Sequence, residues 1–211
     1  MPESNSHGVL TAEAALQRLK EGNRRFASNV RSVDSLLSQL RRADLAVRQE
    51  PFAVILGCSD SRAPAEIVFD QGLGDLFVIR VAGNIVAASQ VGSVEFAVER
   101  FHTRLVVVMG HTSCGAIDAA IEANGARLAY SKNVLSIVDR VRPSVEAVID
   151  TVVAQDKESL ARAVVRANVR ASVDHLCHGS GVIEGLMAND GLVVAGAVYD
   201  LASGAVEWLP P

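Results

Sequence analysis

The sequence predicts an α/β fold in which a central, mostly parallel β-sheet is flanked by helices. Four short apolar runs have the uninterrupted pattern of strands buried on both faces. Stretches with helical periodicity lie between these runs, and strand alternating with helix indicates a parallel sheet with covered faces. The four runs are residues 52–57, 76–82, 105–110 and 192–199.

The N-terminal part of the chain is expected to form a helical arm over residues 11–48. Thr11 is a typical N-cap, and Leu16, Leu19 and Phe26 fall at helical spacing, which predicts a helix over 12–28. A second helix is predicted over 34–48, and it is expected to end before Pro51 because the residue before a proline is disfavoured in a helix. Residues 1–10 are expected to be a flexible leader.

The remaining elements complete one domain. Five further helices are predicted, over residues 63–70, 90–102, 114–124, 134–154 and 158–178. After a turn at Ser203-Gly204, residues 206–209 are expected to form an antiparallel edge strand at the C-terminus. We therefore expect residues 11–211 to form a single α/β domain that includes the arm.

Composition excludes several classes of function. The 211 residues are 49% hydrophobic and 21% charged, enough apolar material for a sizeable core. The net charge is −4 and there is no basic tract, so no nucleic-acid partner is expected. The apolar runs are too short to span a bilayer, and the polar start lacks the pattern of a signal peptide. We expect no membrane partner and a cytoplasmic location. Three cysteines in a chain of this length do not indicate a set of disulfide bonds, and in a reducing compartment they are expected to be buried, catalytic or metal-bound.

Residues suited to metal binding follow two of the predicted strands. Cys58 follows the run 52–57, and His111 and Cys114 follow the run 105–110. In open parallel sheets, ligands bind beyond the carboxyl ends of the strands. Two cysteines and one histidine are a ligand set of catalytic zinc, which keeps its fourth position for water. The pattern predicts one Zn²⁺ per chain.

Asp60 and Arg62 extend this candidate site. In an extended segment, residues 58, 60 and 62 face the same way, so the Asp60 carboxylate would pair with the Arg62 guanidinium and stay ionised. Such a carboxylate can orient a zinc-bound hydroxide, or bind zinc itself if Arg62 lets go. Taken alone, Cys58 could be a buried apolar side chain and the Asp–Arg pair a structural ion pair. Their joint position at one sheet edge favours a zinc site.

A second group, His175, Cys177 and His178, lies on the predicted helix 158–178. Cys177 would point away from the two histidines. We interpret this group as ordinary helix packing and surface.

The motif Cys58-Ser59-Asp60-Ser61-Arg62, followed by His111-x-x-Cys114, resembles the β-class carbonic anhydrases, most closely bacterial members of the plant-type branch. The resemblance extends to Arg80-x-Ala82-Gly83-Asn84 and Gly92-Ser93-Val94-Glu95-Phe96-Ala97-Val98. It implies reversible hydration of CO2 to bicarbonate and a proton by attack of zinc-bound hydroxide on CO2. It also implies that Cys58, His111 and Cys114 bind zinc, that Asp60 and Arg62 are catalytic, and that Asp60 binds zinc only when it displaces the water.

The same resemblance implies a substrate pocket. The Gln49 amide, the Phe77 ring and the backbone N–H of Gly115 match substrate-binding positions of the family. The pocket is expected at the interface of a homodimer or homotetramer, so that Gln49 and Phe77 act across subunits. The chain departs from the plant pattern at Ala82, where valine is expected, and at Phe96, where a tyrosine hydroxyl is lost.

Two alternatives stay open from the residues alone. The same site could hydrolyse CS2 or COS, which are linear like CO2. The chain could also be a non-catalytic structural zinc or redox thiol protein, although a structural site normally has four protein ligands and the fourth would have to be Asp60. For the enzyme, two thiolates leave zinc a weaker Lewis acid than three histidines do, so we expect activity to rise toward alkaline pH.

Overall fold

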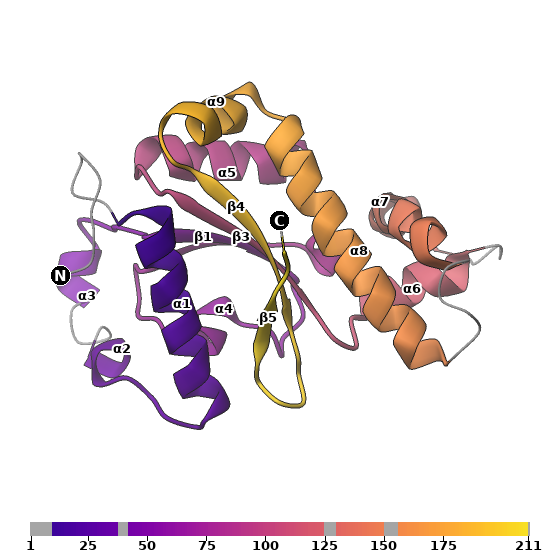
Figure 1. Cartoon of the computed structure of the whole chain (residues 1–211), viewed down its shortest axis with the longest axis horizontal. Coiled ribbons are helices and arrows are strands. Elements are labelled where there is room, and N and C mark those ends of the chain that lie inside the picture. The colour runs from indigo at the N-terminus through magenta and orange to yellow at the C-terminus, as the bar shows by residue number, and fades with distance from the viewer. Residues whose placement is uncertain (1–9, 38–41, 125–129, 150–155, 211) are drawn as a thin grey trace.

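Five strands form one sheet in the order β2-β1-β3-β4-β5 (Figure 1). They are β1 (Ala53–Gly57), β2 (Leu76–Arg80), β3 (Leu105–His111), β4 (Val193–Tyr199) and β5 (Val206–Trp208). The first four are parallel and β5 is antiparallel to β4. The computed structural model describes residues 10–37, 42–124, 130–149 and 156–210. The predicted fold class is confirmed, including the antiparallel edge strand.

Helices cover both faces of the sheet, and the side chains of its central strands point alternately into the two cores beneath them. Val54 and Leu56 of β1 pack into the core beneath α5 (Ala88–Arg100), α8 (Lys157–His178) and α9 (Gly181–Asn189). Ala53 and Ile55 pack into the other core, beneath α1 (Ala12–Ala27) and α4 (Ala65–Val68). Burial on both faces explains the uninterrupted apolar run.

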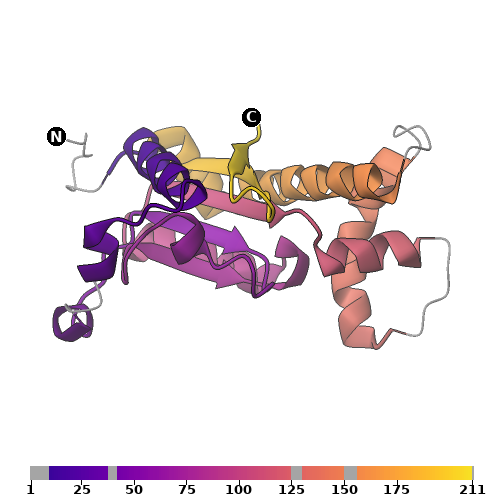
Figure 2. The same ribbon diagram turned by 90° about the horizontal axis from the view of Figure 1, so that it is seen from below.

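The two ends of the sheet carry different helices. Helices α6 (Gly115–Ala123) and α7 (Lys132–Ile149) lie beyond the carboxyl ends of the parallel strands, whereas α2 (Val33–Leu37) and α3 (Arg42–Leu45) lie at the opposite end (Figures 1 and 2). None of the helices in the described ranges is long and apolar enough to cross a membrane. The carboxyl end and the amino end of the sheet thus have different surroundings, since different helices lie at each.

The segment predicted as one helix over 34–48 differs in the structure. It holds α2 and α3, residues 38–41 lie outside the described residues, and residues 46–50 are not helical. Leu37 is 47% and Val47 is 89% exposed, so these two apolar side chains pack little against the body of the fold, and short helices need such packing. Residues 1–9 of the expected leader and 150–155 at the end of the predicted helix 134–154 also lie outside the described residues.

Helix α9 was not among the predicted elements. Ile183 is its buried residue, and Gly181 and Gly185 weaken its helical propensity. The sequence therefore offers no apolar stripe that would identify it. A short 3₁₀ turn over Ala82–Asn84 likewise follows β2, where the prediction extended the strand to residue 82.

Helix α1 is fastened to the body of the fold by a buried asparagine. Asn23 Nδ2 donates hydrogen bonds to the carbonyls of Val68 (3.1 Å) and Gly204 (2.9 Å), and its Oδ1 accepts one from the N–H of Val206 (2.8 Å). The Thr11 hydroxyl accepts from the N–H of Ala14, as predicted for the N-cap. Helix α1 is thus tied to both α4 and the β4–β5 hairpin.

The close approach of α1 to the chain after α4 predicts a glycine requirement. A Cβ atom at Gly22 would lie 1.8 Å from the Phe69 carbonyl oxygen and 2.8 Å from Gln71 Nε2. We expect Gly22→Ala to lower the free energy of unfolding by about 2–3 kcal/mol, because the backbone has to move. Denaturant titration of the purified protein measures this change.

Gly185→Ala is the matched control, since a Cβ at this position in α9 would meet no atom within 4 Å. It should raise the free energy of unfolding by about 0.5–1 kcal/mol through helical propensity. Equal effects of the two substitutions would contradict the packing argument.

Candidate metal centre

Three ligand-bearing residues meet at the carboxyl end of the sheet. Cys58 follows β1, His111 is the last residue of β3, and Cys114 caps the N-terminus of α6. Because β1 and β3 pair with Gly57 opposite Met109, Cys58 lies beside the end of β3. The Cys58 and Cys114 sulfurs are 3.9 Å apart, and the ligand atoms of all three residues lie within 4.8 Å of one another. The three side chains are buried.

A tight turn brings Cys114 back toward His111. Ser113 has a left-handed backbone conformation with φ of 54°, which reverses the chain between β3 and α6. Thr112 fixes this turn to the end of β4: its N–H donates to the Tyr199 carbonyl (3.0 Å), and its hydroxyl accepts from the N–H of Leu201 (3.0 Å). The three-residue spacing of His111 and Cys114 therefore corresponds to a turn that brings the two side chains to the same side, as expected.

His111 is prepared to bind a cation. Its Nδ1 lies 2.9 Å from the Thr112 carbonyl oxygen, which can only accept, so Nδ1 carries the hydrogen of the neutral ring. Nε2 then holds a lone pair, and it is buried with no hydrogen-bond partner. Leaving a buried polar atom unpaired costs about 1–3 kcal/mol. A metal ion would satisfy it, and two sulfurs with one imidazole nitrogen form a set that suits zinc.

The two thiols influence each other strongly. A hydrogen bond from Cys114 lowers the pKa of Cys58, and the same contact raises the pKa of Cys114. Burial lowers the pKa of His111, but the neighbouring Cys58 sulfur outweighs it, so that the net shift is upward. The contact thus favours the thiolate at Cys58 and the thiol at Cys114, and binding of a metal ion to both sulfurs would release the remaining proton.

Asp60 is held by Arg62 in a two-pronged ion pair. Asp60 Oδ1 accepts from Arg62 Nε (2.9 Å) and Oδ2 accepts from Arg62 Nη2 (2.7 Å). This hydrogen bonding holds the pKa of Asp60 well below its usual range. Asp60 Oδ2 lies 3.9 Å from His111 Nε2. An ionised carboxylate therefore faces the metal ligands.

The backbone of this pair is a turn, which corrects the expected extended segment. The N–H of Ala63 donates to the Asp60 carbonyl (3.1 Å), and the N–H of Arg62 donates to Asp60 Oδ1 (2.9 Å). A side-chain-capped turn is a common conformation for aspartate. This turn, rather than the alternation of side chains along a strand, brings the Arg62 guanidinium to the Asp60 carboxylate.

Arg80, the last residue of β2, was not predicted to support this site by side-chain contacts. Its Nε donates to the Cys58 carbonyl (3.0 Å) and its Nη2 to the Asp60 carbonyl (2.5 Å). Arg62 Nη2 also donates to the Ser113 carbonyl (3.1 Å), which links the two ligand loops. The sequence offered Arg80 as part of the family resemblance and as a charged residue in an apolar run, and neither indicated these contacts.

The expected substrate residues do not all lie near the cluster. Gly115 directly follows Cys114, is exposed, and has open space where a Cβ would stand. Gln49 instead lines a pocket of about 800 Å³ at the amino end of the sheet. Phe77, in β2, packs against Phe96 and Phe101 with ring centroids 6.2 and 5.9 Å apart.

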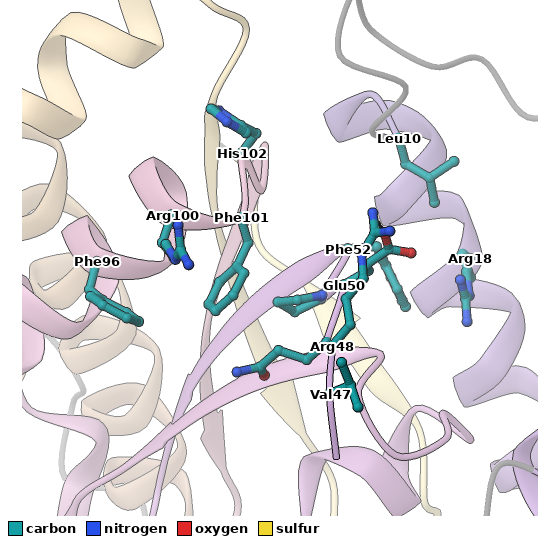
Figure 3. Close-up of a pocket in the computed structure, with 12 residues that line it drawn as sticks. Leu10, Arg18, Val47, Arg48, Glu50, Phe52, Phe96, Arg100, Phe101 and His102 are labelled. Atoms are coloured by element: carbon teal, nitrogen blue, oxygen red, sulfur yellow. Dashed lines mark ion pairs between the residues drawn. The ribbon is translucent and has the colours of Figure 1, made fainter. Parts of the chain in front are cut away.

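Figure 3 shows this pocket between α5, which carries Phe96 and Arg100, and α1, which carries Arg18. Strand β1 separates the pocket from Cys58, and its five residues span about 16 Å. Within one chain, the structure therefore does not bring Gln49 and Phe77 to the metal ligands.

The group at the end of α8 has ordinary contacts. His178 pairs with Asp174 at 3.1 Å, four residues earlier on the helix, and Cys177 is partly buried. Within the described ranges, Cys58, His111 and Cys114 are the one group of three or more His, Cys, Asp or Glu side chains placed to hold a metal ion.

Comparison with known proteins agrees with this geometry. A sequence model described as "Carbonic anhydrase" matches residues 53–206. The chain is 40% identical to carbonic anhydrase 2 of Mycobacterium tuberculosis over 191 residues, which cover 90% of this chain and 89% of that protein. It is 37% identical to a carbonic anhydrase of Mycolicibacterium smegmatis, with 98% and 95% covered.

A solved structure has the same fold. It comes from work on two tetrameric β-carbonic anhydrases of Sordaria macrospora, with a TM-score of 0.75, 22% identity, and 90% of this chain and 94% of that chain covered. The family match, the two relatives and the fold agree with the Cys–His–Cys cluster at the sheet edge. The chain belongs to the β-class carbonic anhydrase family, enzymes that hydrate carbon dioxide reversibly.

Proposed function

We propose that Cys58, His111 and Cys114 hold one zinc ion per chain, and that Asp60 and Arg62 are the catalytic residues of reversible CO2 hydration. The observation that carries this proposal is a buried Cys–His–Cys cluster with an unpaired His111 Nε2, beside an ionised carboxylate. Bound zinc would supply a Lewis acid that makes water a nucleophile near neutral pH.

Asp60 orients the attacking oxygen in this proposal. As an ionised carboxylate it can only accept hydrogen bonds, so the O–H of the nucleophile points at Asp60 and a lone pair is left for the carbon of CO2. The two-pronged bond from Arg62 keeps both carboxylate oxygens in place and prevents their protonation. His111 is held in its metal-binding tautomer by the Thr112 carbonyl.

We assign the substrate-binding roles of Gln49 and Phe77 to the site of a second copy of the chain, and that of Gly115 to its own site. Gly115 is exposed and directly follows the proposed ligand Cys114, whereas Gln49 and the aromatic group around Phe77 lie at the other end of the sheet. Phe96 in that group is 54% exposed, so this aromatic group has a face that a second copy would cover. A symmetric pair of copies would bring each half to the other.

Self-association and a cytoplasmic location are parts of the same proposal. The Sordaria macrospora structures are of tetrameric enzymes, which supports association of this chain with itself. Its three cysteines are all free of disulfide bonds, which suits a reducing compartment. Carbon dioxide and bicarbonate are the proposed small-molecule partners.

The central test combines stopped-flow CO2 hydration with zinc analysis of the purified protein. The native protein should carry one zinc per chain and hydrate CO2 faster at alkaline than at neutral pH, because the thiolates weaken the Lewis acid. Cys58→Ser should lose zinc and hydration together, while the control Cys177→Ser keeps both. Stoichiometric zinc without hydration would contradict the proposal, and activity of that sample on CS2 or COS would identify the alternative.

Removing Arg62 tests the role of the ion pair. In Arg62→Ala the Asp60 carboxylate is free to reach the ligand position beside His111 Nε2, now 3.9 Å away. We expect hydration to fall by roughly tenfold to a hundredfold while zinc content stays at one per chain. Arg62→Lys keeps the charge but loses the second hydrogen bond to Asp60, so its hydration rate should lie between those of the native protein and of Arg62→Ala. Full activity of the alanine variant would remove the pair from the mechanism.

Mixing two inactive variants tests whether Gln49 serves the other copy. Gln49→Ala and Cys58→Ser should each have low activity alone. If each site combines its own Cys58 with the partner's Gln49, mixed assemblies contain one intact site and activity returns after the two proteins are unfolded and refolded together. Activity equal to the sum of the separate proteins would show that Gln49 acts within its own chain or not at all.

A further inference from the structure

The turn after β2 supplies a hydrogen bond to one of the proposed metal ligands. The backbone N–H of Gly83 donates to the Cys58 sulfur at 3.3 Å, and the contact is buried. Gly83 and Asn84 both have left-handed backbone conformations, with φ of 69° and 42°. Two consecutive residues in this region are uncommon, so the surrounding structure must hold the turn in place.

Helix α8 provides that support with two polar side chains one turn apart. Asn168 Nδ2 donates to the Gly83 carbonyl at 2.8 Å, and the Ser172 hydroxyl donates to the Asn84 carbonyl at 3.2 Å. Both side chains are buried, and both reach across to a turn more than eighty residues earlier in the sequence. The two carbonyls of the strained turn are thus fastened to a single helix.

The helix can reach the turn because β3 has a glycine where they cross. A Cβ at Gly110 would lie 2.7 Å from a Val169 methyl and 3.2 Å from a Val165 methyl of α8. Gly110 directly precedes His111. The close approach therefore brings Asn168 to the turn whose Gly83 N–H contacts Cys58.

We propose that Asn168 is a positioning residue of the metal centre, which acts through Gly83 on the Cys58 sulfur. The proposal rests on the zinc ligands proposed above and deepens them. Hydrogen bonds to a ligating thiolate withdraw charge from the sulfur and so tune the ion it binds. By fixing the Gly83 carbonyl, Asn168 keeps the Gly83 N–H on the sulfur, and Ser172 assists it through Asn84.

Replacing zinc by Co²⁺ makes the hydrogen bond from Gly83 to the Cys58 sulfur measurable, because Co²⁺ bound to thiolates has a sulfur-to-metal charge-transfer absorption band whose wavelength depends on the donor strength of the sulfur. In Asn168→Leu the Cys58 sulfur should become the stronger donor, and the band should move to longer wavelength. The zinc dissociation constant should nevertheless rise by about tenfold, because the Cys58 sulfur is no longer held in position by the turn, and this loss outweighs its greater donor strength. The apparent pKa of the pH–rate profile should rise because the bound ion is a weaker Lewis acid.

Asn23→Leu is the matched control. Asn23 is also a buried asparagine that donates to a backbone carbonyl, that of Val68, but it lies in α1 on the other face of the sheet. It should lower thermal stability without moving the cobalt band, zinc affinity or pH profile. If Asn168→Leu behaves in the same way, Asn168 is a structural residue and the inference is wrong.

Ser172→Ala keeps the test decisive if Asn168→Leu does not fold. It removes one hydrogen bond and should shift the band in the same direction by a smaller amount; an unchanged band would then overturn the inference. Failure of the proposed metal centre is a different result, because native protein would itself show no thiolate-to-cobalt band.

Discussion

The parallel pairing of β1 with β3 is the constraint on which the metal centre depends. It places the carboxyl ends of both strands at one edge, so that Cys58 meets His111 although two helices, a strand and a 3₁₀ turn separate them in sequence. A parallel pair needs such a long crossover and helices over both faces. The two apolar cores, built around β1 and β3, hold the pair in register.

This arrangement leaves the metal-free centre short of partners. His111 Nε2 is buried without a hydrogen bond, beside two buried sulfurs 3.9 Å apart. The unpaired nitrogen disfavours the folded chain, and a bound cation would relieve that cost. Because a ligand that binds the folded state stabilises it by mass action, metal binding and folding of this sheet edge should be coupled.

Periodicity and residue type predicted the parts of the molecule that depend on burial and ligand chemistry. The apolar runs identified all four parallel strands, and the thiols and imidazole at their ends identified the cluster. Backbone hydrogen bonding leaves no such trace: the turn that joins Asp60 to Arg62 and the Gly83 N–H at Cys58 have no side-chain pattern. Helix α9, which buries only Ile183, has too small an apolar face to be recognised.

A single sequence describes one copy, whereas the proposed site is divided between the two ends of the sheet and completed by a second copy. No side chain bridges the roughly 16 Å of β1 that separates the Gln49 pocket from Cys58. Phe96 is exposed at one end, and Gly115 is exposed with open space where a Cβ would stand at the other. Association that buries the aromatic group would also complete the site, so that the same contact would favour both assembly and catalysis.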